Sequence, residues 1–417
     1  MRHFSAQETA VDHYTITEGP VPVVTLIDER LSTTTICLAS AYGARHDPVG
    51  RCGSAHLLEH LLMSAPSGDV PSLSEHVERL GGHANAETGP DRMLFYAQVH
   101  PDDAEDIAGL LYRAVLEPRW EEPTLVREKR AVFQELAAAA ADPADLVQDA
   151  ALAALFPGHP LGQPVGGTTA DVEALDLASL AAGHAERLLT APLTAVVVGP
   201  RAPAAIDPAI AAVAADTLAR VGTAADLPAP LAEPVAVTEP NWPGEFSWFC
   251  AAARSVPQHD VRRPHFDVLA HLLGSSSSSL LYRRLRGEAG LAYAFQAWHR
   301  GYADTGAWRL LAGVEPQNGN AAVDVVRATL EELADRGPKP DDLAPALRQA
   351  RMSVLTTLDN PLECARYLAV HSGGATGWSP SREIESIDGI DADDIRRAAE
   401  QTLAGLRVVV RPEAEAR

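Results

Sequence analysis

A proline-rich stretch near the middle of the sequence places the strongest constraint on the fold. Residues 223–243 are rich in proline and alanine and lack helical periodicity, as a semi-rigid linker would. The chain has 417 residues, which exceeds the size of one ordinary hydrophobic core. We therefore expect two domains, residues 1–222 and 244–417, joined by the linker 223–243.

The two parts share one coarse order of predicted elements. Each opens with β-like segments, continues through a helix, a glycine-containing turn and further strands, and ends after long helices in a β-like segment. These segments are residues 23–27, 33–41, 54–64, 85–100 and 195–199 in the first part, and 245–252, 264–273, 292–315 and 406–411 in the second. The pattern favours a duplicated α+β unit over a simple parallel doubly wound sheet.

The composition is that of a globular protein with an acidic surface. Apolar residues make up 46% of the chain and charged residues 22%, and the formal net charge is -22. Nucleic-acid binding and docking on anionic lipid both reward basic patches, so we expect no nucleic-acid and no membrane partner. No apolar run approaches the length of a membrane-spanning helix.

Two features favour a cytoplasmic location. The first fifteen residues, MRHFSAQETAVDHYT, contain no apolar segment of the signal-peptide type. The cysteines are scattered, without CxxC spacing, at Cys37, Cys52, Cys250 and Cys364. Cys52 precedes the histidine pair His56 and His60 and could be proposed as a metal ligand, but we expect a reduced, partly buried thiol.

The segment with the clearest chemistry is Gly53–Met63, which reads GSAHLLEHLLM. It has helical periodicity, with Ser54 as the expected N-cap. The leucines share one broad side of this helix: Leu57, Leu58, Leu61 and Leu62. His56, Glu59 and His60 share the remaining arc. Two imidazoles spaced in this way can bind one zinc ion, with the carboxylate beside the water on the metal. The alternative is a helix whose polar edge happens to carry these residues.

A third protein ligand must come from another segment. Residues 121–141, EEPTLVREKRAVFQELAAAAA, read as a helix with Pro123 near its first turn. Glu128 and Glu135 are two turns apart and so point in nearly the same direction. Either could be an ordinary solvated carboxylate. If the histidines bind zinc, one of the two could ligate it while the other supports the site.

With these motifs the chain resembles the pitrilysin/insulinase-type inverted zincins, a family of HxxEH metallopeptidases, and in particular the small branch similar to mitochondrial processing peptidase. The resemblance extends beyond HLLEH and follows the family's order over nearly the whole chain. The matching segments are LGGHANAET (80–88), REKRAVFQE (127–135), FPGHPLGQPVGG (156–167), LYRRLRGEAGLAYAF (281–295) and YADTG (302–306). It implies an α+β fold of two similar domains, each a mostly antiparallel sheet covered by helices, which together form half of a peptide-enclosing chamber.

The resemblance also implies a role for each residue of the zinc motif. His56, His60 and Glu135 match the ligands of one zinc ion per chain. Glu59 matches the catalytic base, and Glu128 matches a carboxylate that supports the metal ligands.

Further positions match residues that contact the substrate in this family. Arg286 and Tyr293 match an Arg/Tyr pair that the C-terminal domain presents to bound peptide. Without the family, the first would pass as a solvated helix charge and the second as a core aromatic. The strand around Asn85 and Ala86 would pair with an extended substrate, which permits broad peptide specificity.

Three positions depart from the family pattern. Asp47 stands where a Glu is frequent, Gln134 stands where a second carboxylate is frequent, and Gly274 is followed by serines instead of a glycine-rich loop. None of these changes removes a ligand or the base, so they affect the expected substrate preference more than the expected activity.

The resemblance implies a zinc endopeptidase that hydrolyses peptides or unfolded polypeptides inside a closed chamber. Because one sequence carries both the metal motif and the Arg/Tyr pair, a homodimer is the simplest expectation. One alternative is a subunit of a heterodimeric processing peptidase, for example one that removes leader peptides. Others are a non-catalytic assembly subunit of the same fold and a zinc hydrolase that is not a peptidase.

Overall fold

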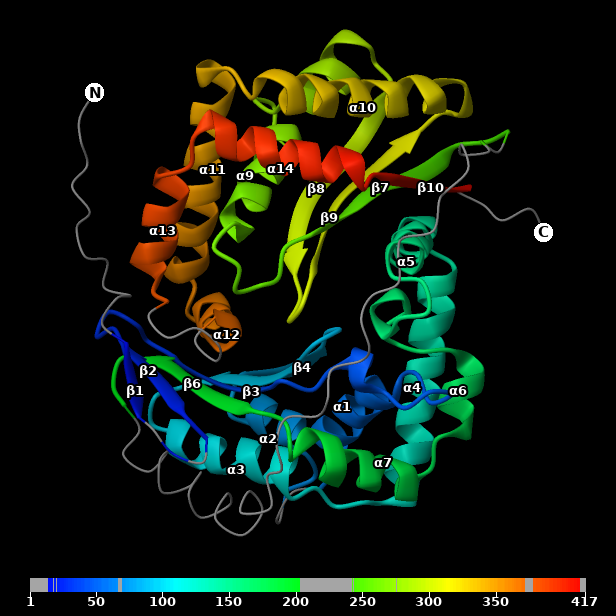
Figure 1. The fold of residues 1–417 in the computed structure, drawn as a ribbon. Helices are drawn as coiled ribbons and strands as arrows, with labels where there is room; N and C mark the ends of the chain where they lie inside the picture. Colours follow the sequence, from blue (N-terminus) through cyan, green and yellow to red (C-terminus); the bar gives the residue numbers. More distant parts are fainter. Residues whose placement is uncertain are drawn as a thin grey trace. The chain divides into compact units, whose positions relative to one another are not determined.

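The structure is a computed structural model, and it describes residues 14–17, 19, 21–66, 70–202, 242, 244–274, 276–371 and 378–412 (Figure 1). Apart from residues 242 and 244, the region around the expected linker 223–243 lies outside the described residues, as does the alanine-rich tract at 209–215. The division of the chain at that linker stays a prediction.

Two compact units make up the chain, and each draws on both halves of the sequence. Unit 1 comprises Met1–Leu136, Pro164–Pro228 and Leu355–Ser381. Unit 2 comprises Ala137–Gln163, Ala229–Val354 and Arg382–Arg417. Each unit has its own sheet, and each sheet is mostly or wholly antiparallel. This confirms the expected α+β class with two similar sheet-and-helix units.

The sheet of unit 1 has the strand order β1-β2-β6-β3-β5-β4, and only the pair β2–β6 is parallel. Its strands are β1 (Thr15–Thr17), β2 (Val23–Ile27), β3 (Thr34–Ser40), β4 (His83–Thr88), β5 (Met93–Val99) and β6 (Leu193–Gly199). All residues of β3 and β6 are buried. Strands covered on both faces carry nearly continuous apolar runs, and β6 reads LTAVVVG for this reason.

Helices cover both faces of this sheet. Those of unit 1 are α1 (Ser54–Ser64), α2 (Leu73–Arg79), α3 (Ala104–Leu116), most of α4 (Glu122–Ala140), α6 (Thr169–Ala174), α7 (Leu177–Gly183) and α12 (Pro361–His371), with the short 3-10 helix η2 (Ala44–His46) and the π-helix η4 (His184–Leu188). α12 packs on β3 and β6, α3 packs on β3 and β5, and α1 packs on β4. Figure 1 shows α12 and α3 on opposite faces of the sheet.

The sheet of unit 2 has the order β10-β7-β9-β8 and is antiparallel throughout. Its strands are β7 (Ser247–Ser255), β8 (Ala292–Gly301), β9 (Gly306–Val314) and β10 (Arg407–Pro412). Its helices are α5 (Pro143–Leu155), α9 (Arg263–Leu273), α10 (Gly319–Arg336), most of α11 (Pro340–Asp359), most of α13 (Pro380–Asp388) and α14 (Ala392–Ala404), with the 3-10 helices η3 (Pro160–Gly162) and η7 (Pro316–Asn318) and the π-helix η6 (Tyr282–Glu288).

Each sheet is covered in part by a helix from the opposite half of the sequence. α5 precedes the expected linker but packs on β7 and β10 of unit 2, where Val147, Ala151 and Leu155 share a core with Cys250. α12 follows the linker but packs on β3 and β6 of unit 1. The packing of these two helices thus crosses the boundary between the two halves of the sequence.

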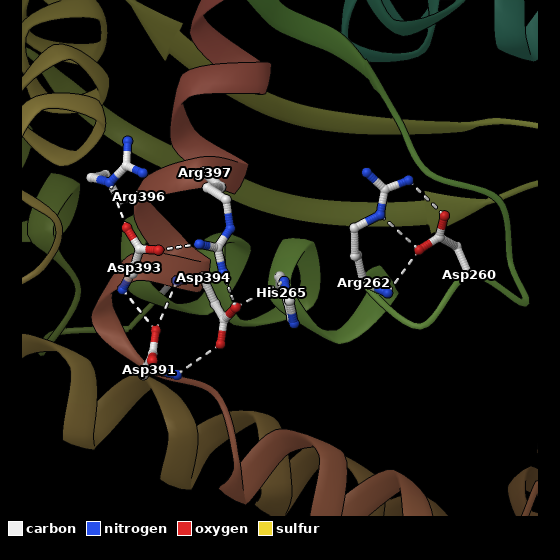
Figure 2. Close-up of polar contacts among 8 residues, drawn as sticks. All are labelled: Asp260, Arg262, His265, Asp391, Asp393, Asp394, Arg396 and Arg397. Carbon is white, nitrogen blue, oxygen red and sulfur yellow. Dashed lines mark hydrogen bonds and ion pairs between the residues drawn. The ribbon is translucent and has the colours of Figure 1, made fainter.

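Charged side chains fix the start of α14 in unit 2 (Figure 2). The carboxylate of Asp391 accepts hydrogen bonds from the backbone N–H groups of Asp393 and Asp394, and so forms the N-cap. Arg397 donates to Asp394, which lies 3.9 Å from the ring of His265 on α9. The figure also shows the pairs Arg396–Asp393 and Arg262–Asp260. These contacts tie the first turns of α14 and α9 together.

No described helix is both long enough and apolar enough to cross a membrane.

Candidate metal centre

Helix α1 carries the histidine pair, and its apolar side is packed into the core. Its span, Ser54–Ser64, agrees with the helix expected from the sequence. The apolar side is buried, comprising Leu57, Leu58, Leu61, Leu62 and Met63. His56, Glu59 and His60 lie on the remaining side and are each partly exposed. The packing of the leucines therefore sets the direction in which the three polar side chains point.

The start of α1 is capped from outside the helix, so the expectation of Ser54 as N-cap is wrong. Ser54 is the first helical residue, and its hydroxyl donates to the carbonyl of Arg51 at 2.6 Å. The carboxylate of Asp47 accepts from the N–H groups of Gly53 at 2.8 Å and Ala55 at 3.0 Å. Because it bonds the donors that begin the helix, Asp47 does the work of an N-cap. Burial raises the pKa of this carboxyl to about 7.

Glycines allow the end of the 156–167 segment, Gly166 and Gly167, to lie against this helix start. Gly53 has φ 90°, and a Cβ there would meet the carbonyl oxygen of Gly166 at 2.4 Å. Gly167 has φ 75°, and a Cβ there would meet the carbonyl oxygen of Cys52 at 2.1 Å. Only glycine tolerates such positive φ values and such close approaches. Two of the motifs noted in the sequence thus meet at the histidine helix.

The side chains of His56, His60 and Glu135 converge on one point. Their ligand atoms all lie within 4.8 Å of one another. Glu135 Oε2 is 3.4 Å from His56 Nε2 and 3.4 Å from His60 Nε2. Donor atoms around a tetrahedral zinc with bonds of about 2.0–2.1 Å lie roughly 3.3 Å apart. The spacing and the nitrogen–oxygen donor set therefore fit a zinc ion.

Cys52 is not part of this cluster. Among the described residues, the only group of three or more potential ligands that converges in this way is His56, His60 and Glu135. Cys52 forms no disulfide and has intermediate exposure, and burial raises its pKa. None of the four cysteines, all of which lie within the described residues, forms a disulfide.

Glu128 supports the cluster from behind His60. Its Oε2 is 3.4 Å from His60 Nδ1, the ring nitrogen that does not face Glu135. Its Oε1 accepts from Arg127 Nε at 3.0 Å. Burial works against ionisation of Glu128, but the bonds to His60 and Arg127 outweigh burial and lower its pKa. A carboxylate in this place holds the proton on Nδ1 and leaves the lone pair of Nε2 for a metal.

The two histidines differ in their proton affinity. Burial, together with the neighbouring His60, lowers the pKa of His56. Burial also acts against protonation of His60, but Glu128, Glu135 and Glu59 outweigh it and raise the pKa of His60. A metal ligand must be the neutral imidazole, so protonation of His60 competes with metal binding here. Nδ1 of His56 is buried and has no hydrogen-bond partner among the described residues.

Glu59 lies beside the ligands and is held by Thr88 at the end of β4. The Thr88 hydroxyl donates to Glu59 Oε2. No described hydrogen bond engages Oε1. Burial raises the pKa of Glu59, and the bond from Thr88 partly offsets that rise. A carboxylate with raised proton affinity and one available oxygen is suited to act as a general base.

Thr88 is the site residue that reading the sequence missed. It ends the LGGHANAET segment, and its side chain lies on the same face of β4 as the buried Ala86. Strand alternation from Ala86 could have indicated that Thr88 points toward α1.

Asn85 and Ala86 lie on β4, which ends the described sheet of unit 1 and pairs there with β5 alone. Asn85 is exposed and Ala86 is buried. An edge strand carries backbone donors and acceptors that an extended peptide can use. Pairing of substrate with β4 stays a prediction.

Arg286 and Tyr293 belong to unit 2, whereas the histidine cluster belongs to unit 1. Arg286 lies in η6, is exposed, and stacks over the ring of Tyr282 at 5.2 Å. Tyr293 lies in β8 where the pairing with β9 shifts register, and its side chain is outside the described part. Their role toward a bound peptide stays a prediction. The effect on substrate preference of Gln134 and Gly274, where the sequence departs from the family pattern, also stays a prediction.

Family models match most of both halves of the chain. Residues 23–169 match "Insulinase (Peptidase family M16)" and residues 207–350 match "Peptidase M16 inactive domain". An uncharacterized zinc protease of Streptomyces coelicolor is 25% identical over 407 residues, covering 92% of this chain and 86% of that protein. One of Mycobacterium leprae is 28% identical over 302 residues, covering 71% and 67% respectively.

Solved structures agree on the fold. A protease from Helicobacter pylori superposes with a TM-score of 0.82 at 16% identity, over 96% of this chain and 99% of that one. The resemblance read from the sequence motifs is thereby confirmed. The chain belongs to peptidase family M16, the insulinase family.

Proposed function

We propose that this protein is a zinc metalloendopeptidase that hydrolyses peptides or unfolded polypeptides. The observation that carries the proposal is the meeting of His56, His60 and Glu135 within 4.8 Å, with Glu59 held beside them by Thr88. The printed names of the relatives, zinc proteases, support the same activity.

Each residue of the site has a distinct part in this reaction. His56 Nε2, His60 Nε2 and a Glu135 oxygen would hold zinc. When bound, zinc supplies Lewis-acid polarisation of the scissile carbonyl and lowers the pKa of water to about 7. Glu59 accepts the proton of the attacking water and delivers it to the leaving amine. Glu128 keeps His60 in the required tautomer, and Thr88 keeps Glu59 in place.

The substrate would lie along β4, near Asn85 and Ala86, and would be held further by Arg286 and Tyr293. A peptide that pairs with an edge strand is recognised mainly through its backbone and less through its side chains. The proposal therefore includes broad sequence tolerance. It also includes a homodimer, because one chain carries both the metal motif and the Arg/Tyr pair.

Zinc content and peptide hydrolysis, measured on one preparation, test the proposal. We expect about one zinc per chain and cleavage of unstructured peptides that stops after chelation and returns when zinc is added. X-ray absorption should show nitrogen and oxygen ligands and no sulfur. A folded protein that holds zinc but cleaves no member of a diverse peptide library would favour the alternative of a non-catalytic subunit. A folded protein that holds no zinc would refute the site itself.

A further inference from the structure

Arg309 of unit 2 is a buried cation that the proposed reaction does not use. It lies on β9 and is only 8% exposed. Within the described part of the chain it makes no hydrogen bond or ion pair, and its Nε is buried without a partner. A guanidinium carries five donors and keeps its charge, so burying it unpaired is costly. We therefore expect this guanidinium to pair with another group in the functional state of the protein.

The strand pattern places Arg309 on the face of the sheet that α5 partly covers. Ala307 and Leu311, two residues before and after it on β9, both pack with the apolar residues of α5. Alternate residues of a strand share a face, so Arg309 points to the same side. Its cross-strand neighbour on β8 is Trp298, which is half-buried.

Trp298 holds the guanidinium in a way that leaves its donors available. The Cζ atom of Arg309 lies 4.8 Å from the centre of the Trp298 ring. A cation–π contact attracts the charge of the guanidinium to the ring and does not require its N–H groups to be spent on a hydrogen bond. The contact with Trp298 therefore leaves hydrogen-bond donors of Arg309 available to a ligand.

An acidic residue lies near Arg309 without pairing to it. Asp149 of α5 interacts electrostatically with Arg309, but no ion pair within 4.0 Å joins them. Burial, together with Asp145, raises the pKa of Asp149. The negative charge of Asp149 would compete with any anion that approaches Arg309.

We propose that Arg309 is a binding site for a carboxylate of the peptide substrate, with Trp298 orienting the guanidinium. The proposal rests on the proposed peptidase function. The planar guanidinium of an arginine can donate two parallel hydrogen bonds to the two oxygens of a carboxylate. A lysine or a neutral donor cannot match this geometry. In a peptide that carboxylate is either the chain end or the side chain of an aspartate or glutamate. The site would thus add a preference for carboxylate-bearing peptides to an enzyme that otherwise recognises its substrate mainly through the backbone.

Peptide binding to the full-length protein tests this directly. Glu59→Gln is used as the background so that the peptide is not consumed, and affinity is measured by fluorescence anisotropy. The first pair is one labelled peptide without acidic residues, prepared in two forms: with a free C-terminal carboxylate and with an amidated C-terminus. A second, amidated pair differs by Glu against Gln at one position. We expect about tenfold to hundredfold tighter binding of the carboxylate form in one of the two pairs, and that pair identifies the source.

Four further substitutions in this background separate the guanidinium from general charge. Arg309→Met should abolish the preference, and Arg309→Lys should retain only part of it because the charge stays while the fork is lost. Asp149→Asn should strengthen the preference by removing the competing charge. Arg300→Met is the matched control, since Arg300 is an exposed arginine of β8 on the same face. It removes the same charge and should leave the preference unchanged.

Three results would overturn the site: no carboxylate preference with Arg309 intact, a full preference in Arg309→Met, or an equal loss in Arg300→Met. Thermal unfolding checks that each variant is folded, and Arg309→Lys decides the question if the methionine variant is not. Failure of the peptidase proposal is distinguishable. Absent hydrolysis with an intact preference contradicts the reaction alone, whereas normal hydrolysis without a preference contradicts the Arg309 site alone.

Discussion

At the residue scale, the separation of base from ligand is the first point to test. Glu59→Gln should lower hydrolysis at least a hundredfold while zinc content stays unchanged, because a general base contributes about that much and Glu59 is outside the ligand set. Glu135→Gln should weaken both zinc binding and hydrolysis. Peptide cleavage rates and elemental analysis of the same samples measure the two effects. Loss of zinc in the first variant and its retention in the second would reverse the assignments and make Glu128 the ligand candidate.

Thr88 predicts a change in the pH dependence of hydrolysis. Burial raises the pKa of Glu59, and the hydroxyl of Thr88 offsets part of that rise by bonding the charged form. Removing the hydroxyl favours the protonated carboxyl, which cannot accept a proton. Thr88→Val should therefore move the acid limb of kcat/KM to higher pH. Thr88→Ser keeps a hydroxyl and should restore the wild-type limb; an unshifted limb in the valine variant would remove Thr88 from the site.

At the element scale, Asp47 controls the start of the histidine helix. Burial raises its pKa from 3.8 to about 7, so the folded state binds more protons than the unfolded state between these values. The contribution of Asp47 to stability must then fall as pH rises from about 4 to 7. Asp47→Asn removes this titration. We expect chemical denaturation to show that wild-type stability decreases more than that of Asp47→Asn between pH 5 and 7.5. Equal decreases would mean that Asp47 titrates normally.

α12 holds β4 through one charged group. Arg366 pairs with Glu87 on β4 and with Glu363 at 2.6 Å, and Tyr96 donates to Glu87 at 3.1 Å. Glu87 and Thr88 are consecutive, so β4 is anchored on both faces where it meets Glu59. Since both partners are partly exposed, we expect a coupling of only about 0.5–1 kcal/mol between Arg366→Ala and Glu87→Ala in a double-mutant cycle of unfolding.

The functional effect of this anchor should exceed its effect on stability. Arg366→Ala should lower kcat more than it raises KM, because the base would be less well placed while the peptide-pairing edge remains. Arg366→Lys should recover part of kcat. A change in KM alone would assign Arg366 to substrate binding instead.

At the scale of the whole molecule, the prediction concerns the contribution of unit 2 to the proposed reaction. Arg286→Ala and Tyr293→Phe should each lower kcat/KM about ten- to hundredfold without changing zinc content, because each removes a donor to the bound peptide. If two chains share a site, mixing inactive Glu59→Gln protein with Arg286→Ala protein should restore partial activity after subunit exchange. Cleavage at the wild-type rate by both unit 2 variants would leave that unit without a role in catalysis.

Much of the local structure was determined by the sequence itself. The bounds of α1 and β2 agree with their periodicity, because helix and strand patterns depend on residues a few positions apart. The placement of His56, Glu59 and His60 on one side of α1 follows from the same short-range geometry. The family was recognisable because its motifs stand in order along the chain.

The tertiary structure decided which distant groups meet. From spacing alone, Glu128 and Glu135 were interchangeable as ligands, and only the tertiary structure brings Glu135 Oε2 within 3.4 Å of both Nε2 atoms and Glu128 Oε2 within 3.4 Å of His60 Nδ1. The capping of α1 by Asp47 in place of Ser54, the bond from Thr88 to Glu59, and the packing of α5 and α12 on sheets from the opposite half of the sequence have the same origin. Each depends on contacts between segments far apart in the chain, which no local periodicity records.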